Sequence, residues 1–418
     1  MTLENKKKHD LKLKRINDAI ALKEPDMVPM TPPTELFPIF NAGYTVAEVI
    51  YDTSLSKMRH AAIKYLKDFD PDQGTGVGMV FAGEGPALEM SAPKNMRWAG
   101  MPGDIIDKNS LQQFIEFPLL LDDEFDEFFS DRTGWILRKA LPRSAELLEP
   151  FSAFYPDAVV SGARQMAAVF STPQFKEMIK KFWAIDEFYK SYQEKSAEIA
   201  REIEEMGYPN LMGGMAGVPF DSYSDFYRGT ILSLTDLYDR PEYVERYIEE
   251  AFEQQIEMIR ATKGIGEGKF VFMALHKGMD GFMSDEYYRK YYWRHLQQII
   301  LEIIDSGKVP YIYTEGRYNS RLDCLSEVPP GKVFYHFETV DMAEAKKKLG
   351  NIACISGGFP TSLLDWGTPE QVRDEAKRLL DICAPGGGFI FETSCGLGNC
   401  KRENVEALFD TVRTYGKY

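Results

Sequence analysis

Val309-Pro-Tyr-Ile-Tyr313-Thr-Glu315-Gly316 is a short apolar run closed by polar residues, and it opens a series of such runs. The others are residues 333–335 before His336, 352–355 before Gly357-Gly358, and 389–391 before Cys395. Helix-like stretches, including residues 341–349 and 369–382, separate these runs. Regular alternation of strands and helices predicts a parallel sheet of the α/β class.

The pattern extends upstream, because residues 269–275 form another apolar run before His276, and a helix is expected from Ser284 to about Asp305, where Gly307 stops it. Four or more such units close most easily into a (β/α)8 TIM barrel, with an open doubly wound sheet as the alternative. Residues 212–215 and 219–223 are expected to form a loop over a cavity. We expect one domain, residues 1–418, with an N-terminal extension of about residues 1–40 and an elaborated first half.

Composition narrows the classes of partner. The net charge of −15 argues against a nucleic-acid ligand, which needs clustered Lys and Arg. No segment approaches the ~20 apolar residues of a membrane span. Five cysteines in 418 residues do not make a disulfide framework, so a reducing cytoplasm is the simplest expectation. The sequence leaves open whether the chain forms a homo-oligomer.

Three chemically reactive side chains follow predicted strands: the carboxylate of Glu315, the imidazole of His336 and the thiol of Cys395. The C-terminal ends of parallel strands meet at one edge, where such folds carry their chemistry. Carboxylate, imidazole and thiolate are also zinc ligands, so these residues indicate a metal site. The alternatives are a pair between Glu315 and an arginine (Arg317 or Arg321), a satisfied interior histidine, and a small buried cysteine.

Each of four other residues near the predicted strand ends has two possible interpretations. His276 either lines the cavity or bonds a neighbouring loop, and Tyr313 either donates to a leaving oxygen or is structural. Gly357 and Gly358 either let a flat ligand approach closely or simply permit a tight turn.

Several motifs resemble the uroporphyrinogen decarboxylase superfamily over nearly the whole chain. They are Lys23-Glu-Pro-Asp-Met-Val-Pro29, Gly357-Gly-Phe-Pro360, Gly367-Thr-Pro-Glu370, Gly387-Gly-Phe-Ile390 and Glu403-Asn-Val405. The resemblance implies a (β/α)8 barrel. Decarboxylases of this superfamily hold several substrate carboxylates with an arginine-rich N-terminal motif, and residues 30–40 here contain no arginine.

Three further segments resemble the first methyltransferase of anaerobic O-demethylase systems, in the corrinoid-linked branch of the superfamily. They span residues 276–284, 315–322 and 336–338. The zinc pattern of those enzymes, Glu-x14-Glu-x20-His, fits Glu315 and His336, but its first position falls on Ile300, with Glu302 nearby. Related coenzyme M methyltransferases have His-x-Cys-Gly where this chain has Tyr313-Thr-Glu315-Gly316, and they place a cysteine ligand at the position of Cys395.

The resemblance implies a zinc-dependent transfer of a methyl group from an aryl methyl ether to the cob(I)alamin of a partner corrinoid protein. Glu315, His336 and Tyr313 would be catalytic, and His276, Gly357 and Gly358 would face the substrate or the corrinoid. Glu315, His336 and Cys395 would bind the metal. The alternatives are a transferase from methylcobamide to a thiol or folate, a porphyrinogen decarboxylase, and a non-catalytic subunit that docks the corrinoid protein.

Overall fold

Five parallel strands form the central sheet of the computed structural model, which describes residues 1–75, 80–103, 105–154, 162–264 and 268–418. The strands are adjacent in chain order: β3 (Met212–Met215), β4 (Phe270–Leu275), β5 (Val309–Arg317), β6 (Phe334–Thr339) and β7 (Cys354–Gly357). Every neighbouring pair is parallel. The predicted strand–helix alternation is confirmed.

Three further segments close this sheet into a ring. Residues 389–391 bridge β7 through Ile355 and Phe389, and they bridge residue Met30 through Phe391, both in parallel. The amide of Asp72 then donates to the Met30 carbonyl at 2.8 Å, and the amide of Gly74 donates to the Pro209 carbonyl at 3.0 Å, just before β3. The chain therefore forms a (β/α)8 barrel, as predicted, and the predicted N-terminal extension contributes residues 28–31 to its ring.

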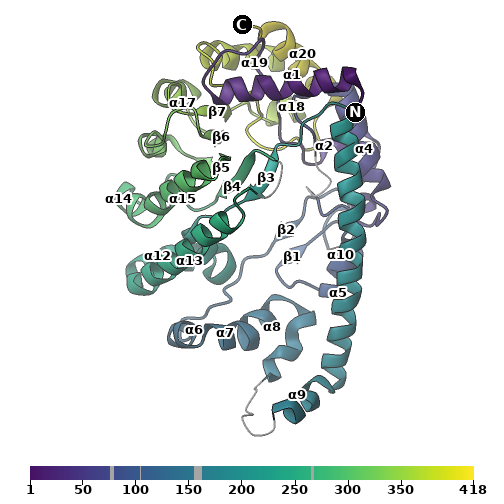
Figure 1. Cartoon of the computed structure of the whole chain (residues 1–418), viewed down its shortest axis with the longest axis vertical. Coiled ribbons are helices and arrows are strands. Elements are labelled where there is room, and N and C mark those ends of the chain that lie inside the picture. Colours follow the sequence, from purple (N-terminus) through teal and green to yellow (C-terminus); the bar gives the residue numbers. More distant parts are fainter. Residues whose placement is uncertain (76–79, 104, 155–161, 265–267) are drawn as a thin grey trace.

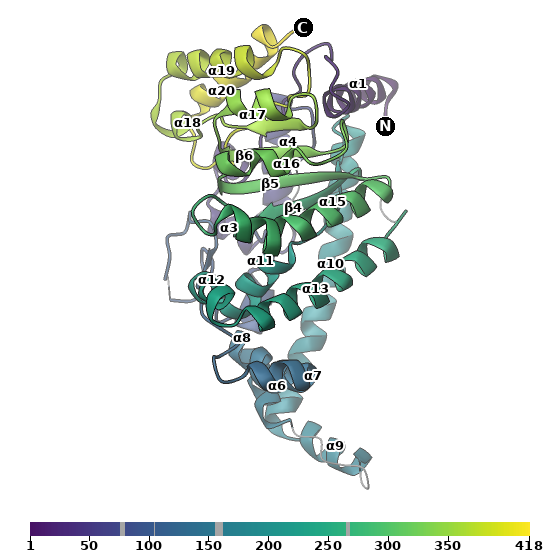
Figure 2. The same cartoon turned by 90° about the vertical axis from the view of Figure 1, so that its left-hand side faces the viewer.

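Helices cover the outside of the barrel, as Figures 1 and 2 show for α13, α15 and α17. The longer helices of the C-terminal half are α13 (Pro241–Ala261), α15 (Arg294–Asp305), α17 (Met342–Leu349), α19 (Pro369–Cys383) and α20 (Arg402–Tyr415). In α15 the buried residues recur at helical spacing, from Leu296 through Ile299 and Ile300 to Ile303, so one face packs on the strands. The Ser284 hydroxyl caps the preceding turn by accepting from the Tyr287 amide, as expected.

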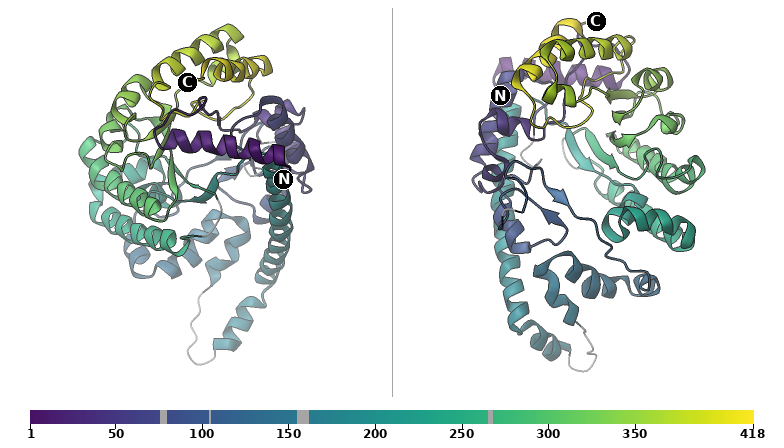
Figure 3. Two further views of the ribbon diagram at one scale, coloured as in Figure 1. Left: turned by 45° about the horizontal axis from the view of Figure 1, so that its top comes forward. Right: turned by 180° about the vertical axis from the view of Figure 1, so that it is seen from behind.

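Helix α1 (Leu3–Ile20) closes the N-terminal end of the barrel and lies across the strands in Figure 3. Its buried residues Ile16, Ala19 and Ile20 pack against an apolar cluster at the starts of the strands. That cluster comprises Leu211, Phe270, Val309, Phe334, Cys354 and Ile390. The N-terminal end of the barrel is therefore closed by apolar packing, and the opposite end is not covered by α1.

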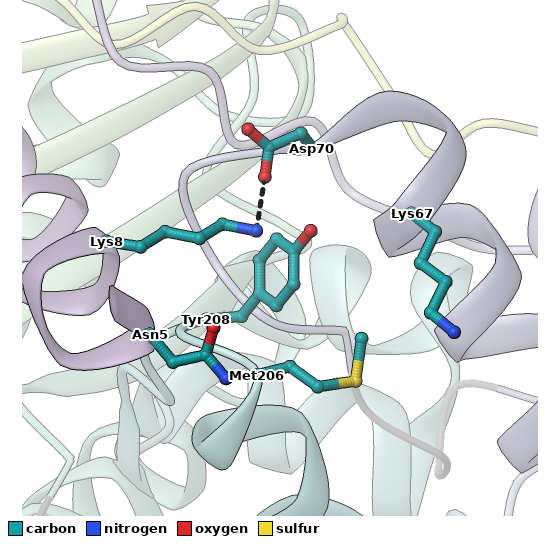
Figure 4. A pocket seen from close by; sticks show the side chains of 6 residues that line it. All are labelled: Asn5, Lys8, Lys67, Asp70, Met206 and Tyr208. Carbon is teal, nitrogen blue, oxygen red and sulfur yellow. Dashed lines mark ion pairs between the residues drawn. The ribbon is translucent and has the colours of Figure 1, made fainter. Parts of the chain in front are cut away.

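A cavity of about 310 Å³ lies on the α1 side of the barrel, and Figure 4 shows its lining. The lining residues are Asn5, Lys8, Lys67, Asp70, Met206 and Tyr208. Lys8 pairs with Asp70 at 2.8 Å and its ammonium group lies 3.8 Å from the centroid of the Tyr208 ring. This packing fastens α1 to α4 (Ser56–Phe69) far from the open end of the barrel.

The first half of the chain is mostly helical. Its remaining elements are α2 (Phe37–Asn41), α3 (Val46–Ile50), α5 (Gly85–Ser91), β1 (Met96–Arg97), β2 (Gln113–Phe114), α6 (Phe125–Ser130), α7 (Arg132–Trp135), α8 (Leu141–Ser144), α9 (Gly162–Phe170), α10 (Pro173–Glu205), α11 (Pro219–Tyr223) and α12 (Thr230–Asp239). The lower part of α10 extends with α8 and α9 beyond the barrel in Figure 1, around a separate apolar cluster of Leu147, Phe175 and Met178.

No helix of the described residues is long and apolar enough to cross a membrane.

The expectation of a loop at residues 212–215 and 219–223 is wrong, because these residues form β3 and α11. The glycines in Met212-Gly-Gly-Met215 allow close strand pairing rather than a loop. A Cβ at Gly213 would lie 1.9 Å from the Gly268 carbonyl oxygen, so no larger residue fits there.

Candidate functional site

The open end of the barrel carries a group of polar side chains, here called the mouth: Glu35, Asp225, His276, Glu315, Glu338 and Cys395. His276 directly follows β4, while Glu315 and Glu338 lie near the ends of β5 and β6. Cys395 and Glu35 follow the ring segments at residues 389–391 and 28–31. All of them lie at the end of the barrel opposite α1.

His276 lies between two carboxylates. Its Nδ1 is 2.5 Å from Asp225 Oδ2, and its Nε2 is 3.7 Å from Glu315 Oε1. The hydrogen bond to Asp225 is the main reason why the pKa of His276 rises to about 9, against the opposing effect of burial. The imidazole therefore carries a positive charge at neutral pH.

Asp221 holds the backbone on which His276 stands. Its carboxylate accepts from the amides of His276 and Lys277 at 3.0 and 2.9 Å, and from the Tyr292 hydroxyl at 2.6 Å. Burial raises the pKa of Asp221 to about 6 in spite of these donors. Sequence reasoning missed Asp221 and Asp225, because both come from α11 and the turn after it rather than from a strand end.

Glu315 points toward His276, with about half of its side chain exposed (49%). Burial of the remainder raises its pKa, which the charge of His276 partly offsets. The alternative pair with Arg321 is not formed, since that guanidinium is buried against Asp285 and the carbonyls of Gly278 and Met283.

Glu35 was also missed, although it follows the first ring segment as His276 follows β4. A Cβ at Gly396 would lie 2.2 Å from the Glu35 carboxyl carbon, so this side chain packs directly against the residue after Cys395. Burial, and then the charge of Glu315, raise the pKa of Glu35. Glu35 thus connects the Glu315 side of the mouth with the Cys395 side.

His336 was expected at a strand end, but β6 continues to Thr339 and His336 lies inside the barrel with no exposed surface. Its Nδ1 is 2.7 Å from Glu392 Oε2, and its Nε2 is 3.1 Å from the Ser394 carbonyl oxygen. The ring of Tyr313 stacks on its imidazole. Burial raises the pKa of the Tyr313 hydroxyl, so that group stays protonated.

Cys395 is the one cysteine with partial exposure, whereas Cys324, Cys354, Cys383 and Cys400 are buried. All five are free thiols. The Thr361 hydroxyl lies 2.7 Å from the Cys395 sulfur. Cys395 is therefore partly exposed, and its thiol is hydrogen-bonded to Thr361.

The family description for uroporphyrinogen decarboxylase (URO-D) matches residues 164–415 of this chain. The chain belongs to the uroporphyrinogen decarboxylase family. The match covers the strands that carry His276, Glu315 and His336, together with Cys395. Apart from Glu35, the residues of the mouth therefore lie within the part of the chain that matches the family.

Curated family members share low sequence identity with this protein. A uroporphyrinogen decarboxylase of Neisseria meningitidis is 22% identical over 182 residues, which are 43% of this chain and 50% of that protein. A uroporphyrinogen decarboxylase of an Azoarcus species is 25% identical over 189 residues, or 44% and 51%. The chain thus spans about half the length of the curated relatives that it matches.

A methyltransferase from Methanosarcina mazei has the same fold over almost its entire length. The TM-score is 0.58 at 16% sequence identity, with 97% of this chain and 98% of that chain covered. This likeness confirms the barrel, including its elaborated first half.

The family fold places two of the predicted glycines where only glycine fits. Gly357 has φ +87°, and a Cβ there would lie 2.0 Å from the Phe337 carbonyl oxygen. Gly358 has φ +74°, and its Cβ would lie 2.4 Å from Met342 Cγ. Tight backbone geometry accounts for both residues, and their proximity to a corrinoid stays a prediction.

The predicted metal ligands Glu315, His336 and Cys395 have donor atoms that suit zinc. In the described residues, however, no group of three or more His, Cys, Asp or Glu side chains is placed to hold a metal ion. The upstream ligand position offers no substitute, because Ile300 is buried in the core and Glu302 pairs with Arg260 at 2.8 Å on the outer helices. The metal role of these three residues therefore stays a prediction.

Proposed function

We propose that this family member is a corrinoid-dependent methyltransferase, which moves a methyl group from a methyl ether, preferably an aryl ether, to the cob(I)alamin of a partner protein. The observation that carries the proposal is the charge of the mouth. Asp225 and Glu315 flank His276, Glu35 and Glu338 lie near Glu315, and Lys277 is already paired with Asp225 at 3.0 Å. A porphyrinogen with several carboxylates would be repelled by these side chains, whereas a neutral ether would not.

The geometry of His276 suits a departing oxygen. When the methyl–oxygen bond breaks, the methyl group passes to the acceptor and the oxygen gains negative charge. The positive imidazole of His276, held by Asp225 and partly exposed beside Glu315, offers a charge-assisted hydrogen bond to that oxygen. The protonated Tyr313 hydroxyl offers a second donor on the adjacent strand.

Zinc is part of this proposal because of the donor set at the mouth. Glu315 and Cys395 would hold the ion, and His336 would not, because its two ring nitrogens already face Glu392 and the Ser394 carbonyl oxygen. Bound zinc would act as a Lewis acid on the ether oxygen.

An acceptor carried by a second protein must reach the same mouth. Large apolar side chains are strongly exposed on elements at this end: Met215 at 72% on β3, Phe226 at 66% after α11, and Trp366 at 83% on α18 (Ser362–Trp366). Exposed Met and aromatic residues are enriched in protein interfaces, which supports a partner docked over the mouth.

The proposal is tested by mixing the purified protein with a reduced corrinoid protein and a panel of methoxyaromatics while the cob(I)alamin absorbance is followed. Absorbance loss that depends on the ether supports the proposal, and Glu315→Gln should slow it. Glu302→Gln is the matched control, because Glu302 lies on the outer face of α15 with Arg260. Decarboxylation of a porphyrinogen without ether-dependent absorbance loss would contradict the proposal.

A further inference from the structure

We propose that Glu392 and His336 act together as a positioning pair that fixes the Ser394–Cys395 segment at the mouth. His336 would then serve the site from inside the barrel, in place of the metal-ligand role that the sequence suggested. The inference rests on the proposed function only in that Cys395 belongs to the working site.

Glu392 is a carboxylate buried inside the barrel, with 1% exposure. It accepts hydrogen bonds from side chains on four other segments of the ring. These are Thr31 Oγ1 at 2.7 Å, Ser356 Oγ at 2.7 Å, Tyr311 OH at 3.2 Å and His336 Nδ1 at 2.7 Å. The carboxylate therefore has a nearly complete set of donors and a single orientation.

Such a group contributes little to stability compared with apolar side chains of the same volume, because the cost of removing its charge from water offsets its hydrogen bonds. The apolar cluster at the base of the barrel shows that these strands can be packed without charge. The hydrogen-bond network around Glu392 therefore points to a role other than stabilising the fold.

The position of His336 indicates what this role is. One ring nitrogen faces Glu392 and the other faces the Ser394 carbonyl, so the ring cannot rotate without losing a contact. The stacked Tyr313 ring holds the plane of the imidazole on one side. The orientation of Glu392 is thus transmitted through His336 to the backbone that precedes Cys395.

Other contacts hold the same segment from outside. The Ser394 amide donates to the Phe359 carbonyl at 2.8 Å, and Thr361 Oγ1 lies 2.7 Å from the Cys395 sulfur. His336 is the contact that comes from the interior of the barrel, so its loss should free the segment without unfolding the ring.

Alkylation of Cys395 under native conditions tests the proposal without requiring methyl transfer. Cys395 is the one partly exposed cysteine, so its reaction with iodoacetamide can be followed by peptide mass spectrometry. We expect Glu392→Gln to accelerate the alkylation about tenfold, because the segment opens more often when its interior contact is weakened. Ser356→Ala removes one donor to Glu392 and should give a smaller change in the same direction, which keeps the test usable if Glu392→Gln does not fold.

Asp236→Asn is the matched control. Asp236 is also fully buried and accepts from Arg228 and Tyr223, but it lies in α12 away from Cys395. It should lower the melting temperature without changing the alkylation rate. Equal alkylation rates in the Glu392, Ser356 and Asp236 variants would overturn the proposal.

Zinc titration of His336→Gln by calorimetry gives a second readout. Zinc affinity equal to that of the unsubstituted protein, or no binding in either, agrees with a positioning role. Binding that is present in the unsubstituted protein and abolished in His336→Gln would make His336 a ligand and overturn the inference. Failure of methyl transfer in the unsubstituted protein would contradict the proposed function alone.

Discussion

The ring of Tyr313 lies parallel to the imidazole of His336, with centroids 4.0 Å apart and planes 9° apart. The two residues are direct partners in the register between β5 and β6. Parallel pairing places side chains of adjacent strands on the same side of the sheet, so the stack follows from the register. The stack places the Tyr313 ring, whose hydroxyl faces the mouth, directly against His336, which is held from within the barrel.

The two functions of Tyr313 can be separated by substitution. Tyr313→Phe keeps the stack and should leave the free energy of unfolding nearly unchanged, whereas Tyr313→Leu should lose about 0.5–1.5 kcal/mol beyond the burial term. If the hydroxyl assists the leaving oxygen, Tyr313→Phe should lower methyl transfer by about 10²–10⁴-fold. Urea denaturation and the cob(I)alamin assay measure the two effects, and a fully active Tyr313→Phe variant would remove the hydroxyl from the mechanism.

The charge of His276 predicts a pH dependence of stability. Its folded pKa of about 9 lies above the ordinary value of 6.5, so its stabilising contribution is complete below pH 6.5 and is lost as the pH rises through 9. The free energy of unfolding of the unsubstituted protein should therefore fall over this range relative to His276→Gln. Urea denaturation at several pH values between 6 and 9.5 measures the difference. Parallel curves for the two proteins would show that Asp225 does not stabilise the imidazolium.

Metal removal tests the zinc part of the proposed function. Protein treated with chelator and then titrated with zinc should bind about one equivalent, with release of protons as the Cys395 thiol ionises. Cys395→Ser and Glu315→Gln should each weaken binding by about tenfold or more, since each removes a ligand. Glu302→Gln should bind as the unsubstituted protein does. If neither the unsubstituted protein nor the variants bind zinc in the calorimeter, zinc takes no part in the mechanism.

Comparing substitutions at Gly357 and Gly386 separates the stability cost of backbone strain from that of a steric clash. Both have positive φ, +87° and +80°, but a Cβ at Gly386 meets no atom within 4 Å while one at Gly357 meets the Phe337 carbonyl oxygen. Gly386→Ala should cost about 1–2 kcal/mol from the left-handed backbone alone. Gly357→Ala should cost clearly more or prevent soluble expression. Similar melting temperatures for the two variants would show that β7 can shift to relieve the clash.

The buried pair of Arg228 and Asp236 predicts a large effect on stability away from the mouth. Arg228 Nε lies 2.6 Å from Asp236 Oδ2, and the arginine also donates to the Leu120 carbonyl at 2.7 Å. Arg228→Met should destabilise by at most about 3–5 kcal/mol, because it removes one of the two arginines that pair with the buried Asp236 and leaves Arg240, whose Nη1 lies 3.1 Å from Asp236 Oδ1. The double variant Arg228→Met/Asp236→Leu should recover most of the loss in chemical denaturation. A double variant as unstable as the single one would indicate that the contact with Leu120 dominates.

Local sequence patterns were enough to predict the barrel, because runs of apolar residues and the helices between them identify parallel strands. They also identified the strand ends that carry His276 and Glu315, and the segment that carries Cys395. They placed the end of a strand at His336, whereas β6 continues to Thr339, because the length of a strand depends on pairing with its neighbours. The metal role of His336 stays a prediction. The roles of Asp225, Glu35 and Glu392 depend on contacts with residues that lie 51 or more positions away in the chain, such as His276 for Asp225 and His336 for Glu392. These partners become visible in the folded chain alone, because contacts across a closed ring are set by the register of neighbouring strands and not by any local pattern of residues.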